Sequence, residues 1–285
     1  MDRWLVIANC QTVGLANSLS LMNPKVHVES CDVSVFIKDI PKWAEDIKNF
    51  DKVFVIDQIV NMGWLDFSVY QNVIVIPVME FHGYHPDICY ITTGSGSNVS
   101  YVESPLSHYN SLICFSGFKK GIKEEEVLAL YNADIFERSG YFRLWHEEKQ
   151  SFLQRSRELG YDFSAAFRRW SLRGSFMYSV NHPKIECLYD IAMAATVKAG
   201  REPVDCAMRP HDNLIAGPIF PIYPAIAERY SIEGSYYFKI GGYYRLIELT
   251  EFVARSFDMY RRIGADNLEP APPYKTQYDA VYAAI

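Results

Sequence analysis

The turn at residues 9–11 places a thiol between two carboxamides. Asn9, Cys10 and Gln11 follow an apolar run at residues 4–8 and precede a stretch that is predicted to be helical. Backbone N–H groups at a helix start favour negative charge, so we expect the pKa of this cysteine to lie below its usual range. Asn9 and Gln11 could then donate hydrogen bonds to an oxyanion. The alternative is structural, with Cys10 as a small buried residue that closes a tight turn.

A second group of polar side chains occurs in the segment FHGYHPD, which contains His82, His85 and Asp87. A histidine close to its ordinary pKa can take a proton from a hydroxyl or a thiol, and an aspartate can hold the imidazole in the required tautomer. We therefore predict His85 and Asp87 as catalytic residues and His82 as a substrate-binding residue. Alternatively, the histidines cap backbone groups and Asp87 caps a helix. No further ligand cluster accompanies them, so no metal site is predicted.

The segment SVNHPK contributes Asn181 and His182, directly before Pro183. A residue that precedes proline is pushed towards an extended conformation, which places His182 at the end of a loop or the start of a helix. We predict His182 as a catalytic residue and Asn181 as a hydrogen-bond donor to the substrate. The alternative is that Asn181 or His182 caps the helix that follows.

Four short runs rich in Val and Ile are spaced so that helical crossovers fit between them. Continuous apolar runs of this kind are typical of parallel strands that are covered on both faces. The sequence therefore predicts an α/β fold with a parallel-sheet core in its N-terminal half. The four runs are at residues 4–9, 26–30, 52–57 and 72–78, and a fifth strand is predicted at residues 111–118.

The C-terminal half is predicted to be mainly helical, because its apolar residues recur at helical spacing and glycines punctuate the pattern. We expect one domain over residues 1–285, with an α/β region at 1–120 and a helical region at 121–285 packed on it. The Pro-rich tail at residues 268–278 is predicted to be extended. The helices are expected at residues 121–136, 141–159, 186–199 and 244–263.

Five segments occur in an order and spacing that resemble the WcbI-type polysaccharide biosynthesis family, from about residue 4 to about residue 235. They are IANCQTVGLANSL, FHGYHPDICYI, SPLSHYNSLI, FMYSVNHPKIECLYDIA and PIYPAIAERYSI. The chain departs from the family at Ala8, where glycine is common. The resemblance implies an enzyme of capsule or other surface-polysaccharide synthesis that binds coenzyme A (CoA) and transfers an acetyl group to a sugar.

The strand–turn–helix opening is also similar to that of the SGNH hydrolases, in which a serine occupies the corresponding turn. The predicted sheet layers are thus SGNH- or flavodoxin-like, by analogy at the level of the fold.

A CoA site needs several cations and an aromatic surface, because the cofactor carries a phosphate, a pyrophosphate and an adenine. The segment FRRWSLRGSF interleaves arginines with aromatic rings, and a lysine pair precedes residue 121. The alternative for each cluster is a solvated helix face. The predicted cofactor-binding residues are Arg168, Arg169, Trp170, Arg173, Lys119 and Lys120.

The leading hypothesis from the sequence is an O-acetyltransferase that uses acetyl-CoA and a carbohydrate acceptor. In one mechanism His85 or His182 is the general base for direct attack by the sugar, and in the other Cys10 carries the acetyl group transiently. Two rival functions stay open. One is an SGNH-like carbohydrate deacetylase, and the other is a non-catalytic component that binds CoA or a glycan.

Composition excludes several other function classes. The formal net charge of −6 does not supply a general nucleic-acid surface, and no run reaches the roughly 18 apolar residues of a membrane span. The six cysteines are scattered and form no zinc or disulfide pattern. The N-terminus lacks the pattern of a signal peptide, so we expect a cytoplasmic protein. Assembly into a homo-oligomer is left open.

Overall fold

The computed structural model describes residues 1–204 and 206–285 and divides the chain into two compact units. The first unit comprises Met1–Glu80, Gln150–Met177 and Asn181–Ile215. The second comprises Phe81–Lys149, Tyr178–Val180 and Ala216–Ile285. Each unit draws on both halves of the sequence. The predicted single-domain organisation stays a prediction.

A four-stranded parallel sheet forms the core of the first unit and confirms the predicted α/β fold. Its strands are β1 (Asp2–Ala8), β2 (Val26–Asp32), β3 (Lys52–Ile56) and β4 (Val73–Ile76), in the order β2-β1-β3-β4. The strand order reverses between β1 and β3. In open α/β sheets, ligands bind outside the carboxyl ends of the strands at such a reversal, so the turn after β1 lies at a ligand-binding position.

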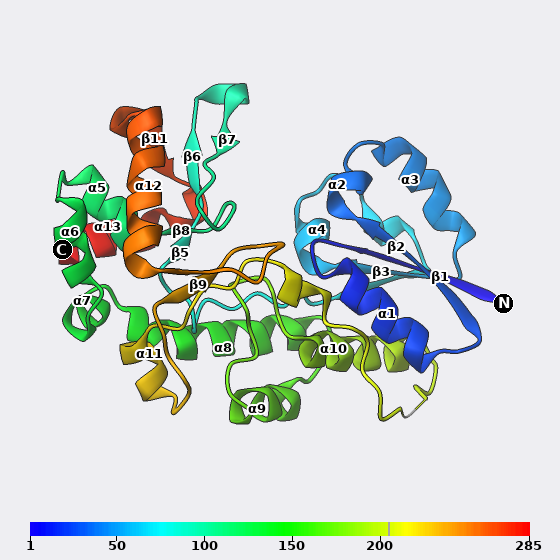
Figure 1. The fold of residues 1–285 in the computed structure, drawn as a ribbon. Coiled ribbons are helices and arrows are strands. Elements are labelled where there is room, and N and C mark those ends of the chain that lie inside the picture. The colour runs from blue at the N-terminus through cyan, green and yellow to red at the C-terminus, as the bar shows by residue number, and fades with distance from the viewer. Residues whose placement is uncertain (205) are drawn as a thin grey trace. The chain divides into compact units, whose positions relative to one another are not determined.

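Helices of the first unit cover this sheet, and Figure 1 shows α1 and α10 lying along one side of it. Gly14 lies against α10, where a Cβ atom would lie 2.5 Å from Cδ1 of Leu188, so the Leu188 side chain would have to shift. The helices are α1 (Thr12–Met22), α2 (Val33–Phe36), α3 (Ile40–Asp46), α4 (Asp57–Asn61), α9 (Ser164–Leu172) and α10 (Ile185–Lys198). The 3₁₀ turns are η1 (Ile47–Asn49), η2 (Phe67–Val69) and η5 (Asn213–Ala216), whose last residue belongs to the second unit.

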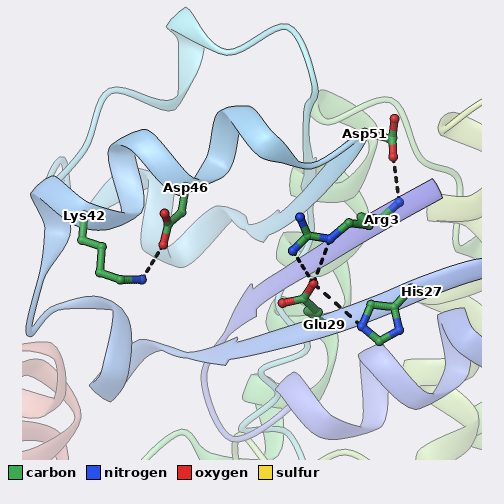
Figure 2. Close-up of polar contacts among 6 residues, drawn as sticks. All are labelled: Arg3, His27, Glu29, Lys42, Asp46 and Asp51. Carbon is green, nitrogen blue, oxygen red and sulfur yellow. Dashed lines mark hydrogen bonds and ion pairs between the residues drawn. The ribbon is translucent and has the colours of Figure 1, made fainter. Parts of the chain in front are cut away.

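Exposed polar contacts join the amino-terminal parts of β1 and β2 (Figure 2). The Arg3 guanidinium donates to Oε1 of Glu29 from Nε at 3.2 Å and from Nη2 at 2.7 Å. The backbone N–H of Arg3 donates to Asp51, and His27 lies 3.8 Å from the same Glu29 oxygen. Exposed pairs of this kind contribute little to stability. These contacts lie towards the amino end of β1, whereas the turn with Cys10 follows its carboxyl end.

The second unit combines short antiparallel strand pairs with helices. Phe238 and Phe252 stack in its core with ring centroids 4.3 Å apart. The strands are β5 (Ile88–Cys89), β6 (Ile91–Thr93), β7 (Ser100–Tyr101), β8 (Asn110–Ser111), β9 (Tyr237–Lys239), β10 (Leu246–Glu248) and β11 (Leu268–Pro270). The helices are α5 (Leu112–Lys119), α6 (Glu124–Val127), α7 (Ala133–Arg138), α11 (Pro224–Arg229), α12 (Leu249–Ile263) and α13 (Lys275–Ala284). Helix α8 (Tyr141–Glu158) contains residues of both units.

Three local predictions were wrong. The apolar run at 111–118 forms α5 rather than a strand, because the Ser111 side chain accepts the backbone N–H of Cys114 and caps the helix. The single helix predicted at 121–136 is divided, since Asn132 caps a new helix by accepting from Ile135 N. The tail at 268–278 was predicted to be extended, which holds for β11 but not for residues 272–278, where a 3₁₀ turn leads into α13.

No helix in the described part of the chain combines the length and apolar character that a membrane span requires.

Candidate functional site

The turn after β1 is held by the Asn9 side chain rather than by glycine. The Asn9 carboxamide oxygen accepts the backbone N–H of Gln11 at 3.1 Å, and the Asn9 carbonyl accepts the N–H of Thr12 at 2.9 Å. An asparagine side chain that bonds the backbone two residues on mimics a backbone turn. The turn therefore forms without a glycine, and Cys10 occupies its centre at the carboxyl end of β1.

Gln11 is fully buried and connects three segments of the first unit. Its Nε2 donates to the carbonyl oxygens of Met79 at 2.7 Å and Asn181 at 3.1 Å, and its Oε1 accepts from Met79 N at 3.2 Å. Both amide hydrogens are thus engaged within the protein. This geometry favours a positioning role for Gln11 over the predicted role of oxyanion donor.

The Cys10 thiol points towards the Asn181 loop. Its Sγ lies 3.5 Å from the Asn181 carbonyl oxygen and 3.8 Å from the Asn9 carboxamide oxygen, and it donates to both. The expectation of a lowered pKa was wrong. Burial, together with the negative charges of Asp32 and Glu80, raises the pKa of Cys10 to about 12. Cys10 is therefore a protonated thiol at neutral pH.

The loop that contains Asn181 and His182 lies in the same unit as Cys10. Burial lowers the pKa of His182 to about 4, an effect that Asp212 partly offsets. His182 is thus neutral near pH 7, and it is a weaker base than an exposed histidine, because burial disfavours the imidazolium. The helix after this loop is capped by Asp212, whose Oδ2 accepts the backbone N–H of Ile185 at 3.0 Å. The capping of α10 therefore does not explain the presence of Asn181 and His182.

The first residues of α4, which follows β3, support the turn through Gln58 and place the buried acid Asp57 beside it in the sequence. The Asn9 Nδ2 donates to Oε1 of Gln58 at 3.2 Å, and Oδ1 of the adjacent Asp57 accepts Val78 N at 2.8 Å. Arg155 Nε lies 3.4 Å from the second Asp57 oxygen, and Arg155 also donates to the Val78 carbonyl. The sequence analysis missed both charged residues. The position of Asp57 as the last residue of the strand predicted at 52–57 was the available signal.

The predicted catalytic Asp87 belongs to the second unit and lies inside its core. Asp87 Oδ1 accepts from the Tyr141 hydroxyl at 2.7 Å and from Ile113 N at 2.9 Å, and Oδ2 accepts from the Tyr223 hydroxyl at 2.7 Å. Asp87 is fully buried, and burial raises its pKa to about 6 despite these hydrogen bonds. Asp87 thus accepts a backbone N–H from the first turn of α5, although the N-cap residue of this helix is Ser111.

The two histidines of the same segment also lie in the second unit. His85 is only 2% exposed, and its backbone N–H donates to the His82 carbonyl. His82 Nδ1 lies 3.8 Å from Glu148. Within the described ranges 1–204 and 206–285, no three His, Cys, Asp or Glu residues form a group that could hold a metal.

The ionisation of Asp87 predicts a stability change with pH. Its pKa in the folded state is raised, so its contribution to stability is complete below about pH 4 and is lost as pH rises through about 6. We expect the free energy of unfolding of the wild type, measured relative to that of Asp87→Asn, to fall by up to about 3 kcal/mol between pH 4 and pH 7. Urea unfolding at several pH values measures this difference.

The exposed Asp266 provides a matched control. Asp266→Asn should keep the pH dependence of the wild type. Parallel pH curves for the wild type and Asp87→Asn would contradict the assigned ionisation.

The predicted cofactor-binding cations do not form one group. In the first unit, Asp190 Oδ2 accepts from Arg169 Nη2 at 3.0 Å and from Trp170 Nε1 at 2.8 Å. These two residues and Arg173 line a cavity, whereas the exposed Arg168 is not part of its lining.

The two lysines predicted to bind the cofactor lie in the second unit. Their ammonium groups donate hydrogen bonds to backbone carbonyls. Lys119 donates to Ala265 and Leu268, and Lys120 donates to Ile285. These bonds favour a structural role for both lysines.

Comparison with known proteins identifies a family and a shared fold. A family model described as "Polysaccharide biosynthesis enzyme WcbI" matches residues 3–204. The fold is similar to a solved structure described as WcbI, a novel polysaccharide biosynthesis enzyme, in a native form without a disulfide bond between CoA and a cysteine. The TM-score is 0.66 at 15% identity, covering 99% of this chain and 95% of that chain. Among curated proteins, none matches this chain.

Proposed function

Because this chain belongs to the WcbI polysaccharide biosynthesis enzyme family, we propose that it transfers an acetyl group from acetyl-CoA to a hydroxyl of a sugar or sugar nucleotide. The observation that carries this proposal is a pair of hydrogen bonds. The Cys10 thiol and the Gln11 carboxamide both donate to the Asn181 carbonyl, and this connects the turn after β1 to the Asn181–His182 loop. The loop that carries His182 is thereby tied to the thiol-bearing turn at the carboxyl end of β1 within one unit, and the His182 imidazole is neutral. This is where an α/β sheet binds its ligands.

The proposed chemistry is direct transfer with His182 as general base. The His182 imidazole takes the proton of the sugar hydroxyl while the oxygen attacks the thioester carbonyl. Carboxamide N–H groups of Asn9 and Asn181 stabilise the negative charge on the carbonyl oxygen. The C–S bond then breaks, and the imidazolium returns its proton to the departing CoA sulfur. His85 is not needed for this route, and Asp87 acts as a core residue.

Direct transfer predicts that the Cys10 thiol is dispensable for the chemistry. A thiol with a pKa near 12 is a poor nucleophile at neutral pH, because only the thiolate attacks. Cys10→Ser should therefore retain most of the transfer activity, since the hydroxyl can make the same hydrogen bonds. A steady-state assay of CoA release measures this. An acetyl group trapped on Cys10, together with loss of turnover in Cys10→Ser, would instead establish the covalent route.

The test of the function is incubation with acetyl-CoA and a panel of sugars and sugar nucleotides. Mass spectrometry should detect the addition of one acetyl group to an acceptor, with release of free CoA. Removal of acetyl groups from acetylated sugars without any need for CoA would replace this proposal with a hydrolase. We further propose that the reaction takes place in the cytoplasm, because all six cysteines are free.

A further inference from the structure

An ion pair of the first unit lies at the carboxyl end of strand β3. Asp57, the first residue of α4, is 4% exposed, and its Oδ2 lies 3.4 Å from Nε of Arg155 in α8. Burial of a carboxylate is costly, and a buried ion pair often contributes no more to stability than apolar side chains of similar volume would. Stability alone therefore does not account for charges at this position.

Both members of the pair hold the backbone of Val78, two residues beyond the end of β4. Asp57 Oδ1 accepts the Val78 N–H at 2.8 Å, and Arg155 Nη2 donates to the Val78 carbonyl at 3.1 Å. Val78 is 1% exposed, so neither of its backbone groups can exchange its partner for bulk water. The pair thus fixes the chain where it leaves the sheet.

Gln11 carries this constraint to the loop that contains His182. Met79, the residue after Val78, donates its N–H to Gln11 Oε1 at 3.2 Å, and its carbonyl accepts from Gln11 Nε2 at 2.7 Å. The same Nε2 donates to the carbonyl of Asn181, the residue before His182. Val78 and Met79 are therefore held at both their N–H and their C=O groups, and Met79 is bonded to the side chain that holds the loop.

The same acid is adjacent to the residue that supports the Cys10 turn. Gln58 follows Asp57, whose Oδ1 accepts the Gln58 N–H at 2.9 Å. Gln58 Oε1 in turn accepts from Asn9 Nδ2 at 3.2 Å. The ion pair is therefore linked to both parts of the proposed site, the turn after β1 and the Asn181–His182 loop.

We propose that Asp57 and Arg155 are positioning residues for His182 in acetyl transfer. They fix the backbone after β4, and through Gln11 this backbone sets the position of the loop that carries the imidazole. Their role in catalysis rests on the proposed function, whereas the hydrogen-bonded connection does not. Because misplacement of a catalytic group by about 1 Å can lower a rate about 10²-fold, a pair that acts only through other groups can change the rate of the chemical step.

Two variants break the connection and leave no charge without a partner. Arg155→Lys keeps the positive charge, but an ammonium cannot reproduce the planar fork that reaches both Asp57 and the Val78 carbonyl. The double variant Asp57→Asn/Arg155→Met removes both charges together. The matched control is Arg157→Lys, which changes an exposed arginine of the same helix whose Nη2 donates to Ser164 Oγ at 3.2 Å.

Steady-state kinetics with acetyl-CoA and its acceptor measure the effect on catalysis. Both variants should lower kcat by about 10–100-fold with KM for acetyl-CoA within about twofold, and the control should match the wild type. In a His182→Gln background the same changes should lower kcat by less than about twofold, because residues that act through His182 have no further effect once the imidazole is gone. An equal loss of kcat in both backgrounds is the result of a purely structural role and would overturn the proposal.

Hydrogen exchange tests the connection without reference to acetyl transfer. Peptides that cover residues 78–80 and 181–186 should exchange about tenfold faster in both variants than in the wild type, and at the wild-type rate in the control. Unchanged exchange, or an unchanged kcat in an active protein, would overturn the positioning role. A wild type that transfers no acetyl group would overturn the proposed function, and faster exchange in the variants would then still support the positioning of the loop by the pair.

Discussion

Replacing His182 with glutamine is expected to lower the rate of acetyl transfer by roughly 10²–10⁴-fold, the usual contribution of a positioned general base. Glutamine keeps hydrogen-bonding capacity but cannot accept a proton from the sugar hydroxyl. Since the proposed role of His182 is confined to the chemical step, the loss should appear in kcat, with little change in KM. Steady-state kinetics with acetyl-CoA and the best acceptor measure both constants.

The pH dependence of kcat for the wild type is a second test of His182 as the general base. The pKa of His182 is lowered to about 4, so the imidazole is in its basic form above that pH. Its contribution to kcat should stay level from neutral pH down to about 5 and decline only near pH 4. His27→Gln is the matched control, because His27 is exposed on β2. Equal kcat values for His182→Gln and the control would exclude His182 as the base.

Replacing Gln11 with alanine is expected to lower the free energy of unfolding by about 3–5 kcal/mol. The substitution deletes a fully buried side chain whose three hydrogen bonds reach Met79 and Asn181. It leaves the Met79 N–H and the Met79 carbonyl oxygen without their partner, whereas the Asn181 carbonyl keeps the Cys10 thiol, and each unsatisfied buried group costs about 1–3 kcal/mol. Urea unfolding monitored by circular dichroism measures the change.

The exposed Gln154 supplies the control for this prediction. Its amide donates to Glu158 on the surface of α8, so Gln154→Ala should change the unfolding free energy by less than about 0.5 kcal/mol. A similarly small change for Gln11→Ala would show that the turn after β1 holds its shape without the buried carboxamide. Loss of the Gln11 connection should also reduce acetyl transfer, because it releases the Asn181–His182 loop.

The sheet could be predicted because its signal is local. Each of the four runs is long enough to identify a strand, and the spacing between runs allows the helical crossovers of a parallel sheet. The run at 111–118 was assigned wrongly because a short apolar run fits a buried helix equally well. There the capping hydrogen bond of Ser111 decided the conformation.

The electrostatics of the site could not be predicted, since they depend on residues distant in sequence. The pKa of Cys10 is raised by burial, by Asp32, the last residue of β2, and by Glu80, which follows β4 in the sequence. The Asp87 carboxylate is occupied by the hydroxyls of Tyr141 and Tyr223, which no local motif reveals. The position of Cys10 at a helix start alone therefore predicted a lowered pKa, whereas the pKa of the thiol is raised.

The connection between Cys10 and the second histidine motif is a further result of tertiary structure. The sequence motif indicated that Asn181 and His182 could act at a site, and the hydrogen bonds from Cys10 and Gln11 to the Asn181 carbonyl place the loop beside the turn. Lys184 and Arg209 were not predicted as binding residues. An isolated lysine or arginine gives no periodic signal in the sequence, and these two come together in the folded chain, where they line the same cavity.

Calorimetric titration of the wild-type protein with acetyl-CoA tests the central claim most directly, since every step proposed for this site begins with that thioester. The account predicts saturable binding of one acetyl-CoA per chain, with a Kd well below about 1 mM. The absence of binding heat at millimolar acetyl-CoA, from a protein shown to be folded by circular dichroism, would contradict it.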